Sequence, residues 1–253
     1  MKDSQEYLDK KAFFDSIITL YGRNVVVEIL EDESVSVHKL HLAQSNREEG
    51  AITQIKQLAT ERGIEIKVHT KEQLSRISKN AKQDQGVAID IVAPNYLKAE
   101  SIEEHLGSDF RLLALDGIQN PQNLGMIIRS AAAGNIDGLL LPTNSSAKIS
   151  PLVIKASAGT LFKIPIFHCK TLEAPLQKLS QNSEIYALSS HAKADIYGVT
   201  TGKRVVFVLG NESEGVTPAV SRLCNASLSI PMARGVESLN VAVTAALLAF
   251  MQN

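Results

Sequence analysis

Phe110-Arg111-Leu112-Leu113-Ala114-Leu115-Asp116 is the stretch that decides the fold of this chain. An apolar run of this length, ended by a charged residue, is typical of a parallel strand that is buried on both faces. The turn Asn120-Pro121-Gln122-Asn123-Leu124-Gly125 follows, and we expect a helix over 124–134. Proline is tolerated in the first turn of a helix, and asparagine is a residue type that caps one. The stretch therefore predicts a strand that leads directly into a helix.

Similar units continue to the end of the chain. Apolar runs predict strands over 139–141, 164–166, 184–189 and 205–209, and helical spacing predicts helices over 151–158, 172–179 and 239–251. Strands that alternate with helices predict a parallel sheet covered on both faces. The last helix is rich in alanine and leucine nearly all round, so we expect more than one of its faces to be buried. A dimer interface is one explanation.

The first half of the chain predicts a separate, small α/β domain. We expect strands over 35–42, 64–68 and 85–92, and helices over 51–62 and 71–77. The polar stretch that follows is interpreted as a linker helix, with a surface helix inside one larger domain as the alternative. We therefore place the domains at 1–95 and 110–253, with a linker over 96–109.

Composition narrows the class of protein. The chain has 253 residues, 44% of them hydrophobic, which supports a full core. It contains no stretch of about 18 apolar residues that would predict a membrane helix. The polar N-terminus lacks the apolar core of a signal peptide. The two cysteines, Cys169 and Cys224, make neither a disulfide framework nor a zinc site, and the six histidines show no metal-ligand spacing. A reduced, cytoplasmic setting is the expectation.

The charge is distributed unevenly, although the net charge is only −1. Residues 1–107 hold 14 Lys and Arg against 18 Asp and Glu, whereas residues 108–253 hold 12 against 9. A mildly basic second half permits a face that binds phosphate groups. Any contact with RNA should depend on local clusters of charge.

Leu209-Gly210-Asn211-Glu212-Ser213-Glu214-Gly215 is a second polar segment, and it ends the strand predicted over 205–209. Open α/β sheets bind ligands at the carboxyl ends of their strands. Gly210 lets a backbone approach a ligand, and Glu212 offers a carboxylate there. The alternative is a polar turn with a helix cap at Thr217. Neither Gly-x-Gly-x-x-Gly nor a phosphate loop occurs, which disfavours nicotinamide and nucleoside triphosphate enzymes.

A third segment, Ile230-Pro231-Met232 followed by Ser238-Leu239-Asn240, precedes the last helix. Ser238 has the chemistry of a helix cap. Asn240 adds a second polar side chain, and a helix N-terminus with Ser and Asn suits an anion. In the first helix, Gly125 costs about 1 kcal/mol relative to alanine, so we expect another backbone or a ligand to approach it closely. Arg129 shares a face with it by i,i+4 spacing.

The three segments together resemble the motifs of the SpoU (TrmH-type) branch of the SPOUT RNA methyltransferases, and the resemblance covers essentially the whole chain. Residues 110–253 resemble the catalytic domain. Residues of about 13–92 resemble a small substrate-binding domain, through Tyr21-Gly22-Arg23-Asn24-Val25 and Asp84-Gln85-Gly86-Val87-Ala88. The resemblance implies a deep trefoil knot in the parallel-sheet α/β domain and an L30e-like fold for the front domain. It also implies a homodimer formed through the catalytic domain, in which the first-motif helix and the last helix meet.

The resemblance further implies the site. S-adenosyl-L-methionine is the expected cofactor, and the residues expected to hold it are Leu188, Ser189, Gly210, Asn211, Ile230, Met232 and Leu239. The residues expected in catalysis are Asn123, Arg129, Glu212, Ser238 and Asn240. No metal is expected. Two positions depart from the family pattern, which often has Asp in place of Asn120 and His in place of Asp84.

The implied reaction moves a methyl group to a ribose 2′-hydroxyl of RNA, most simply a guanosine of 23S rRNA. A guanidinium is a poor base. Arg129 is therefore expected to bind RNA phosphate and polarise the hydroxyl, with a phosphate or water accepting the proton, while Asn123 and Glu212 orient Arg129 and the ribose. Alternatives are tRNA, an antibiotic-resistance site on rRNA, or a non-catalytic RNA-binding protein. The last conflicts with the presence of all these polar residues together.

Overall fold

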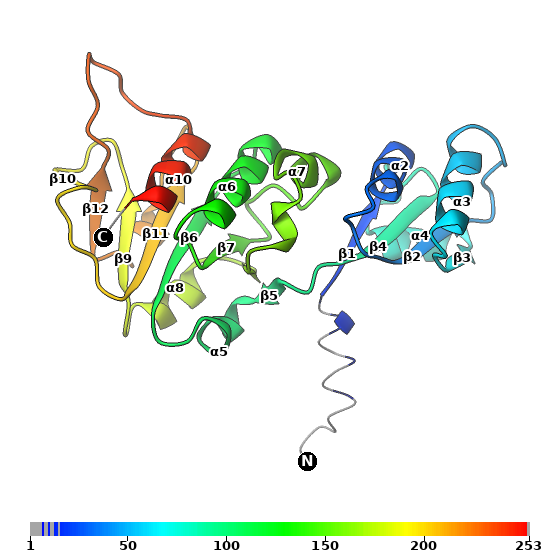
Figure 1. Cartoon of the computed structure of the whole chain (residues 1–253), viewed down its shortest axis with the longest axis horizontal. Coiled ribbons are helices and arrows are strands. Elements are labelled where there is room, and N and C mark those ends of the chain that lie inside the picture. Colours follow the sequence, from blue (N-terminus) through cyan, green and yellow to red (C-terminus); the bar gives the residue numbers. More distant parts are fainter. Residues whose placement is uncertain (1–6, 8–9, 11–12, 15, 252–253) are drawn as a thin grey trace. The chain divides into compact units, whose positions relative to one another are not determined.

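The computed structural model divides the chain into two compact units, Met1–Pro94 and Asn95–Asn253. It describes Tyr7, Lys10, Phe13, Phe14 and residues 16–251. Each unit has a sheet of its own, and Figure 1 labels the elements of both.

The first unit is a four-stranded sheet with helices. Its elements are β1 (Ile17–Tyr21), α2 (Arg23–Glu31), β2 (Val37–Ala43), α3 (Ala51–Glu61), β3 (Ile66–His69), α4 (Lys71–Ser78) and β4 (Val87–Val92). The strand order is β1-β4-β2-β3, in which β4 is antiparallel to both neighbours and β2 and β3 are parallel. The strands and helices predicted for this half agree with the structure to within a few residues, and β1 and α2 are additions to them.

Helix α2 shows how packing overrides local preference. Its run Val25-Val26-Val27 is β-branched and favours strands. The run is nevertheless helical because Val26, Ile29 and Leu30 fall on one buried face. Arg62 stabilises the end of this helix, since its Nη1 donates to the carbonyl oxygens of Ile29 at 3.1 Å and Leu30 at 2.9 Å.

The residues interpreted as a linker, 96–109, belong to the second unit instead. They form β5 (Tyr96–Lys98), the 3-10 turn η1 (Ala99–Ser101) and α5 (Ile102–Leu106). β5 pairs in parallel with β8 (Ile166–Cys169), and Ala99 and Ile102 lie in the buried core. The linker interpretation is wrong because these elements are short, and their polar outer faces conceal the few residues that they bury.

The corrected boundary also changes the charge balance. Residues 1–94 hold 13 Lys and Arg against 15 Asp and Glu, so the first unit is less acidic than a division at residue 107 suggests. Glu103 belongs to the second unit, where its carboxylate pairs with Arg204 at 2.8 Å and Lys178 at 3.6 Å. Its charge is therefore neutralised locally.

The second unit is built on an eight-stranded sheet. Its further strands are β6 (Phe110–Asp116), β7 (Gly138–Pro142), β9 (Glu184–Leu188), β10 (Ala194–Asp195), β11 (Arg204–Gly210) and β12 (Ala226–Ser229). The order is β10-β12-β9-β11-β6-β7-β8-β5, and every neighbouring pair is parallel. The predicted parallel α/β sheet is confirmed. All strands therefore end at one common edge, here called the carboxyl edge.

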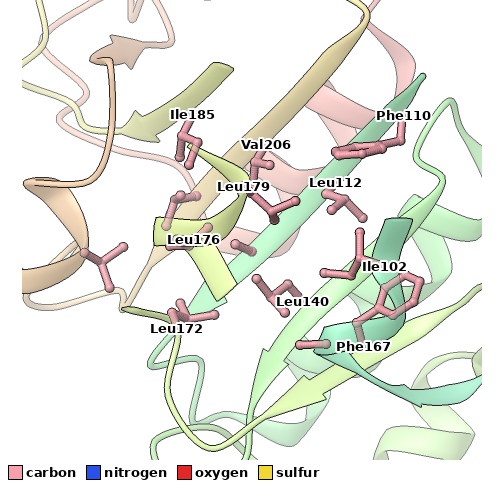
Figure 2. Packing of buried hydrophobic residues seen from close by; sticks show 14 residues of the cluster. Ile102, Phe110, Leu112, Leu140, Phe167, Leu172, Leu176, Leu179, Ile185 and Val206 are labelled. Atoms are coloured by element: carbon pink, nitrogen blue, oxygen red, sulfur yellow. The ribbon is translucent and has the colours of Figure 1, made fainter. Parts of the chain in front are cut away.

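Helices accompany this sheet as expected. They are α6 (Pro121–Ala133), α7 (Pro151–Ala156), α8 (Glu173–Leu179), α9 (Pro218–Ser221) and α10 (Val241–Phe250), with a 3-10 turn η2 (Thr160–Phe162). Figure 2 shows Leu176 and Leu179 of α8, together with Leu172 just before the helix, in the same buried cluster as strand residues such as Leu112 and Val206. Within the described part of the chain, no helix combines the length and apolar character that crossing a bilayer requires.

Helix α6 packs closely against both α7 and α10. A Cβ added at Gly125 would lie 2.5 Å from the Cβ of Ala156 and 2.7 Å from the carbonyl oxygen of Val153, both in α7. The backbone that was expected to approach Gly125 is therefore that of α7. At the other end of α6, a Cβ at Gly134 would overlap the carbonyl of Ala249 in α10. Glycine is required at both ends because backbones meet there.

Candidate active site

The three polar segments meet at the carboxyl edge of the parallel sheet. β6 ends at Asp116 and β11 ends at Gly210, and the register places these two residues opposite each other. The first segment begins α6 just after β6, and the second follows β11 directly. The third connects β12 with α10. Segments that are far apart in the sequence thus converge through sheet topology.

A chain of hydrogen bonds joins all three segments. The Nδ2 of Asn123 donates to Oε1 of Glu212, which links the first segment to the second. The Nδ2 of Asn240 donates to Oδ1 of Asn123 at 3.2 Å, which links the third to the first. Asn240 also accepts from the backbone N–H of Ala242 at 2.8 Å. The amide of Asn123, only 7% exposed, is therefore held at both ends, which fixes the orientation of the Glu212 carboxylate.

Two asparagines at this edge, Asn120 and Asn240, also cap helices. Asn120 caps α6, because its Oδ1 accepts from the backbone N–H groups of Gln122 at 2.8 Å and Asn123 at 3.2 Å. Asn240 caps α10, so the alternative that assigned this cap to Ser238 is wrong. Asn240 takes the N-cap position because its side chain accepts a hydrogen bond from the first turn of α10 and also reaches Asn123.

The second segment forms a tight loop that closes on itself. The backbone of Asn211 is paired with that of Gly215 in both directions, at 3.1 and 2.9 Å. A Cβ at Gly210 would overlap the backbone of Gly215 and Val216. Gly210 is thus required by the returning chain, where the sequence suggested a ligand. The Nδ2 of Asn211 donates to the carbonyl of Gly117 at 2.9 Å and fastens the loop to the end of β6.

Asp116 is a residue of this edge that the sequence analysis did not single out. Its carboxylate is 6% exposed and accepts from the backbone N–H of Thr217 at 2.7 Å, where α9 begins. Thr217 is the N-cap of α9, although its own side chain makes no capping bond there. A carboxylate at the end of a mostly apolar strand was the available signal, since burying such a group requires a donor.

Arg129 and Ser238 are not joined to this network. Both are exposed, and neither makes a hydrogen bond or ion pair within the described part of the chain. Arg129 lies six positions after Asn123, which places the two side chains about 120° apart around α6. The structure therefore brings together Asn123, Glu212 and Asn240 and leaves Arg129 available for a bound molecule.

The residues expected to hold the cofactor line the same edge. Leu188 ends β9 beside Leu228 of β12, and the N–H of Ser189 donates to the carbonyl of Leu228 at 2.9 Å. Ile230 and Met232 follow β12 and are half-buried. Every residue from 233 to 240 is exposed, including Leu239 at 37%. An exposed loop with apolar side chains at the end of a parallel sheet fits a group that is partly apolar and partly polar, such as an adenosyl cofactor.

Two family models match the chain, one in each unit. The model of the SpoU rRNA Methylase family matches residues 111–250. The model described as RNA 2'-O ribose methyltransferase substrate binding matches residues 19–97. Together these two ranges span nearly all the elements described above.

Individual relatives agree with the family models. The 23S rRNA (guanosine-2'-O-)-methyltransferase RlmB of Xylella fastidiosa (strain 9a5c) is 30% identical over 235 residues, which cover 91% of this chain and 94% of that protein. An uncharacterized tRNA/rRNA methyltransferase of Mycobacterium sp. (strain KMS) is 31% identical and covers 91% of this chain and 74% of that protein. The AdoMet-bound rRNA methyltransferase of Sinorhizobium meliloti shares the fold, with a TM-score of 0.60 at 22% identity, over 97% of this chain and 88% of that one. The chain belongs to the SpoU rRNA Methylase family.

Proposed function

We propose that this chain is an S-adenosyl-L-methionine-dependent RNA 2′-O-ribose methyltransferase whose substrate is a guanosine of 23S rRNA. The observation that carries the proposal is the hydrogen-bonded chain from Asn240 through Asn123 to Glu212, which unites three polar segments at one sheet edge. The name of the Xylella relative supports the choice of reaction and RNA. A substrate in the ribosome implies action in the cytoplasm.

The carboxyl edge supplies the residues for the cofactor. The residues that would surround it, largely through loop backbone, are Leu188, Ser189, Gly210, Asn211, Ile230, Met232 and Leu239. When bound, S-adenosyl-L-methionine supplies a methyl group on a sulfonium, which is already an activated leaving group. The protein must then mainly align the ribose hydroxyl with that methyl group and exclude water. The exposed loop 233–240 is the part of the chain placed to cover both.

Asn123, Glu212 and Asn240 act as positioning residues in this proposal. The Asn123 amide donates a hydrogen bond to Glu212 and accepts one from Asn240. It therefore fixes the positions of both side chains. Arg129, by contrast, is exposed. It makes no hydrogen bond or ion pair within the described part of the chain. A guanidinium matches phosphate oxygens with paired donors. Arg129 therefore binds RNA phosphate and polarises the 2′-hydroxyl, and Ser238 lies in the covering loop. The hydroxyl proton leaves to a phosphate oxygen or water.

A trefoil knot in the second unit is part of the proposal. Helix α10 comes last in the chain, yet its C-terminal end is held by the first long strand, because Arg111 of β6 donates to the carbonyl oxygens of Leu248 at 3.4 Å and Met251 at 3.2 Å. The N–H of Asn135, just after α6, donates to the carbonyl of Ala249 at 2.6 Å. A terminal helix fixed between earlier segments supports a threaded path of the chain.

The first unit is proposed to bind RNA in an L30e-like manner. A mixed four-stranded sheet with α2, α3 and α4 supports the fold. At one end of this sheet, Arg23 donates through Nε to the carbonyl of Gln85 at 3.2 Å, and Asn46 donates to the carbonyl of Gly86 at 2.7 Å. Asp84 is 4% exposed and accepts from Ser78 and Gly86, so its charge holds the turn and does not face a phosphate backbone.

A homodimer through the second unit completes the proposal. Met126 of α6 is 41% exposed, and Val243 and Phe250 of α10 are 47% and 58% exposed, although α6 and α10 pack against each other. Exposed apolar side chains on two helices that pack together are the kind of surface that a second copy would cover. The separation of Arg129 from Asn123 around α6 also supports a site completed by two copies.

Labelled cofactor and separated RNA pools test the proposed function. The full-length protein is incubated with unmodified 23S rRNA transcripts, 16S rRNA and tRNA, and the labelled nucleotide is mapped. Label on a ribose of 23S rRNA is the expected result. Label in tRNA would move the substrate to the class suggested by the name of the Mycobacterium relative. Absence of cofactor binding by calorimetry would instead favour a non-catalytic RNA-binding protein.

A further inference from the structure

An exposed aromatic side chain stands at the carboxyl edge, outside the three polar segments. Tyr197 is 63% exposed and follows β10, the outermost strand. Figure 1 shows β10 beside β12 at the edge of the sheet. The order β10-β12-β9-β11 puts three strand steps between β10, which Tyr197 follows, and β11, which Glu212 follows. At the usual strand spacing this is about 15 Å.

The turn that carries Tyr197 is fixed on every side. The carboxylate Oδ1 of Asp195 accepts from the backbone N–H groups of Tyr197 and Gly198, both at 2.8 Å. The N–H of Ile196 donates to the carbonyl of Ser229 at 2.9 Å, and the hydroxyl of Ser229 donates to the carbonyl of Ala194 at 3.2 Å. The turn is thus fastened to the end of β12, from which the third segment begins.

The exposure of Tyr197 follows from this geometry. Ile196 is 1% exposed and fills the interior beneath the turn, so the next side chain along must point outward. A large aromatic ring that is held outward on a rigid turn loses little conformational freedom when it binds a flat partner. Nothing in the packing of the unit requires an aromatic residue there.

The surroundings of Tyr197 favour an anionic partner with bases. Lys193 and His191 are both exposed on the same segment, which leaves the carboxyl edge after Ser189. The carboxylate closest in sequence, that of Asp195, already accepts two N–H groups. A cation such as Lys193 beside an exposed aromatic residue is the combination that binds single-stranded RNA, with a phosphate on the cation and a base on the ring.

We propose that Tyr197 is a stacking platform for a base of the RNA substrate, next to but distinct from the methylated nucleotide, and that Lys193 binds an adjoining phosphate. The inference rests on the proposed function, because it extends the RNA path from Arg129 across the sheet edge. The distance of about 15 Å from β11 places the stacked base a few nucleotides from the target. Tyr197 thereby contributes to the choice of RNA sequence context without touching the reacting atoms.

Substitution of Tyr197 separates stacking from other roles. Tyr197→Ala should raise the KM for 23S rRNA transcript about 10-fold, whereas Tyr197→Phe should keep it near the wild-type value. The affinity for S-adenosyl-L-methionine, measured by calorimetry, should be unchanged in both. Weaker cofactor binding by Tyr197→Ala would overturn the proposal and assign the ring to the adenosyl group. An unchanged KM would overturn it as well.

A fluorescent variant keeps the test independent of catalysis. The chain has no tryptophan, so Tyr197→Trp introduces its sole indole at the platform. Its emission should be quenched by a 23S rRNA fragment and unaffected by cofactor alone. If the protein binds this fragment but methylates nothing, the proposed methyltransferase function is contradicted. The quenching measurement still tests the stacking platform in that case. Emission that does not respond when anisotropy shows the labelled fragment to be bound would contradict the platform.

Lys193 has a matched control at the opposite edge. Lys203 precedes β11 at its amino end and is 84% exposed. Lys193→Ala should reduce the slope of log affinity against log salt concentration by about 0.7, the value for one phosphate of a single strand. Lys203→Ala removes the same charge and should leave the slope unchanged. Equal effects of the two substitutions would show a diffuse electrostatic contribution and overturn the assignment of Lys193.

Discussion

Asn240 donates a hydrogen bond to Asn123 across 117 residues of sequence, at 3.2 Å, and so ties the start of the last helix to the start of the first-motif helix. The same Asn123 donates to Glu212. One buried amide therefore sets the relative positions of all three polar segments. Because each contact is made by a different atom of that amide, the three segments are expected to respond together when one bond is removed.

Asn240→Ser tests this link without removing the helix cap. Serine can still accept from the first turn of α10, so the midpoint of thermal unfolding should stay close to that of the wild type. The donor to Asn123 is lost, and kcat should fall about 10²-fold because Glu212 is no longer held in place. Steady-state kinetics and calorimetry are the measurements. A wild-type kcat in a well-folded Asn240→Ser protein would show that the bond has no part in positioning.

The sequence could predict the segments of this site but not the bond between them. Each segment follows an apolar strand, and that pattern is visible in residues 110–125 and 205–215. Which side chains meet depends on the strand order β9-β11-β6 and on the return of α10 to α6, and these contacts are long-range. Local periodicity carries no information on such distant pairings.

The short elements show a second limit of prediction. β10 has two residues and β12 has four, too few for alternation to be recognised, and Tyr96–Lys98 in β5 was read as part of a polar linker. Long, fully buried strands such as β6 were predicted to the residue, because every one of their positions is buried. The role of Gly210 was misread for a related reason: the sequence shows that a backbone must come close but not which one.

Arg129→Ala is expected to stop methyl transfer and leave the protein intact. The side chain is exposed and has no partner in the described part of the chain, so its loss should not change thermal stability measurably. If it binds RNA phosphate and polarises the hydroxyl, kcat should fall about 10³-fold, while the Kd for S-adenosyl-L-methionine remains near the wild-type value. Arg129→Lys keeps the charge but not the paired donors and should recover only part of the rate. Loss of cofactor binding, or retained turnover, would contradict this role.

Arg111→Met probes how the last helix is fastened. The guanidinium donates to the carbonyl oxygens of Leu248 and Met251 at the end of α10, where helix carbonyls otherwise lack partners. Methionine has similar length but no donor, and we expect the free energy of unfolding to fall by about 3 kcal/mol. Denaturant titration measures the loss. Arg111→Lys keeps the charge but has fewer donors in a different geometry, so its stability should lie between those of the wild type and Arg111→Met. An Arg111→Met protein of wild-type stability would exclude a fastening role.

The first unit should lose stability as the pH falls below about 6.5. His41 shares one hydrogen bond with His69 and another with Asp90, both at 3.0 Å. Burial lowers the pKa of His69 below its usual 6.5, and the charges of His41 and Lys67 lower it further. The unfolded chain then binds a proton at a higher pH than the folded chain, so the stability present above pH 6.5 declines below it.

Asp90 acts in the same direction at lower pH. Burial raises the pKa of Asp90, but hydrogen bonds from His41 and Thr19 outweigh this and bring it below 3.8. Its stabilising contribution is present above pH 3.8 and is lost as the pH falls through the lowered value. Urea unfolding of the full chain at several pH values should show the decline, and His69→Gln should remove the part near pH 6. An unaltered pH profile in that variant would assign the decline to other groups.

Phe250→Asp tests the proposed homodimer. Phe250 is 58% exposed at the end of α10, and a carboxylate placed in an apolar interface is costly to bury without a partner. The dimer dissociation constant should rise about 10²-fold or more, measured by sedimentation over a concentration series. Val68→Asp is the matched control, since Val68 is 60% exposed on β3 of the first unit. Val243→Asp, on the same face of α10, should reproduce the effect of Phe250→Asp. If all three variants sediment as the wild type does, the exposed face of α10 is not the contact between copies.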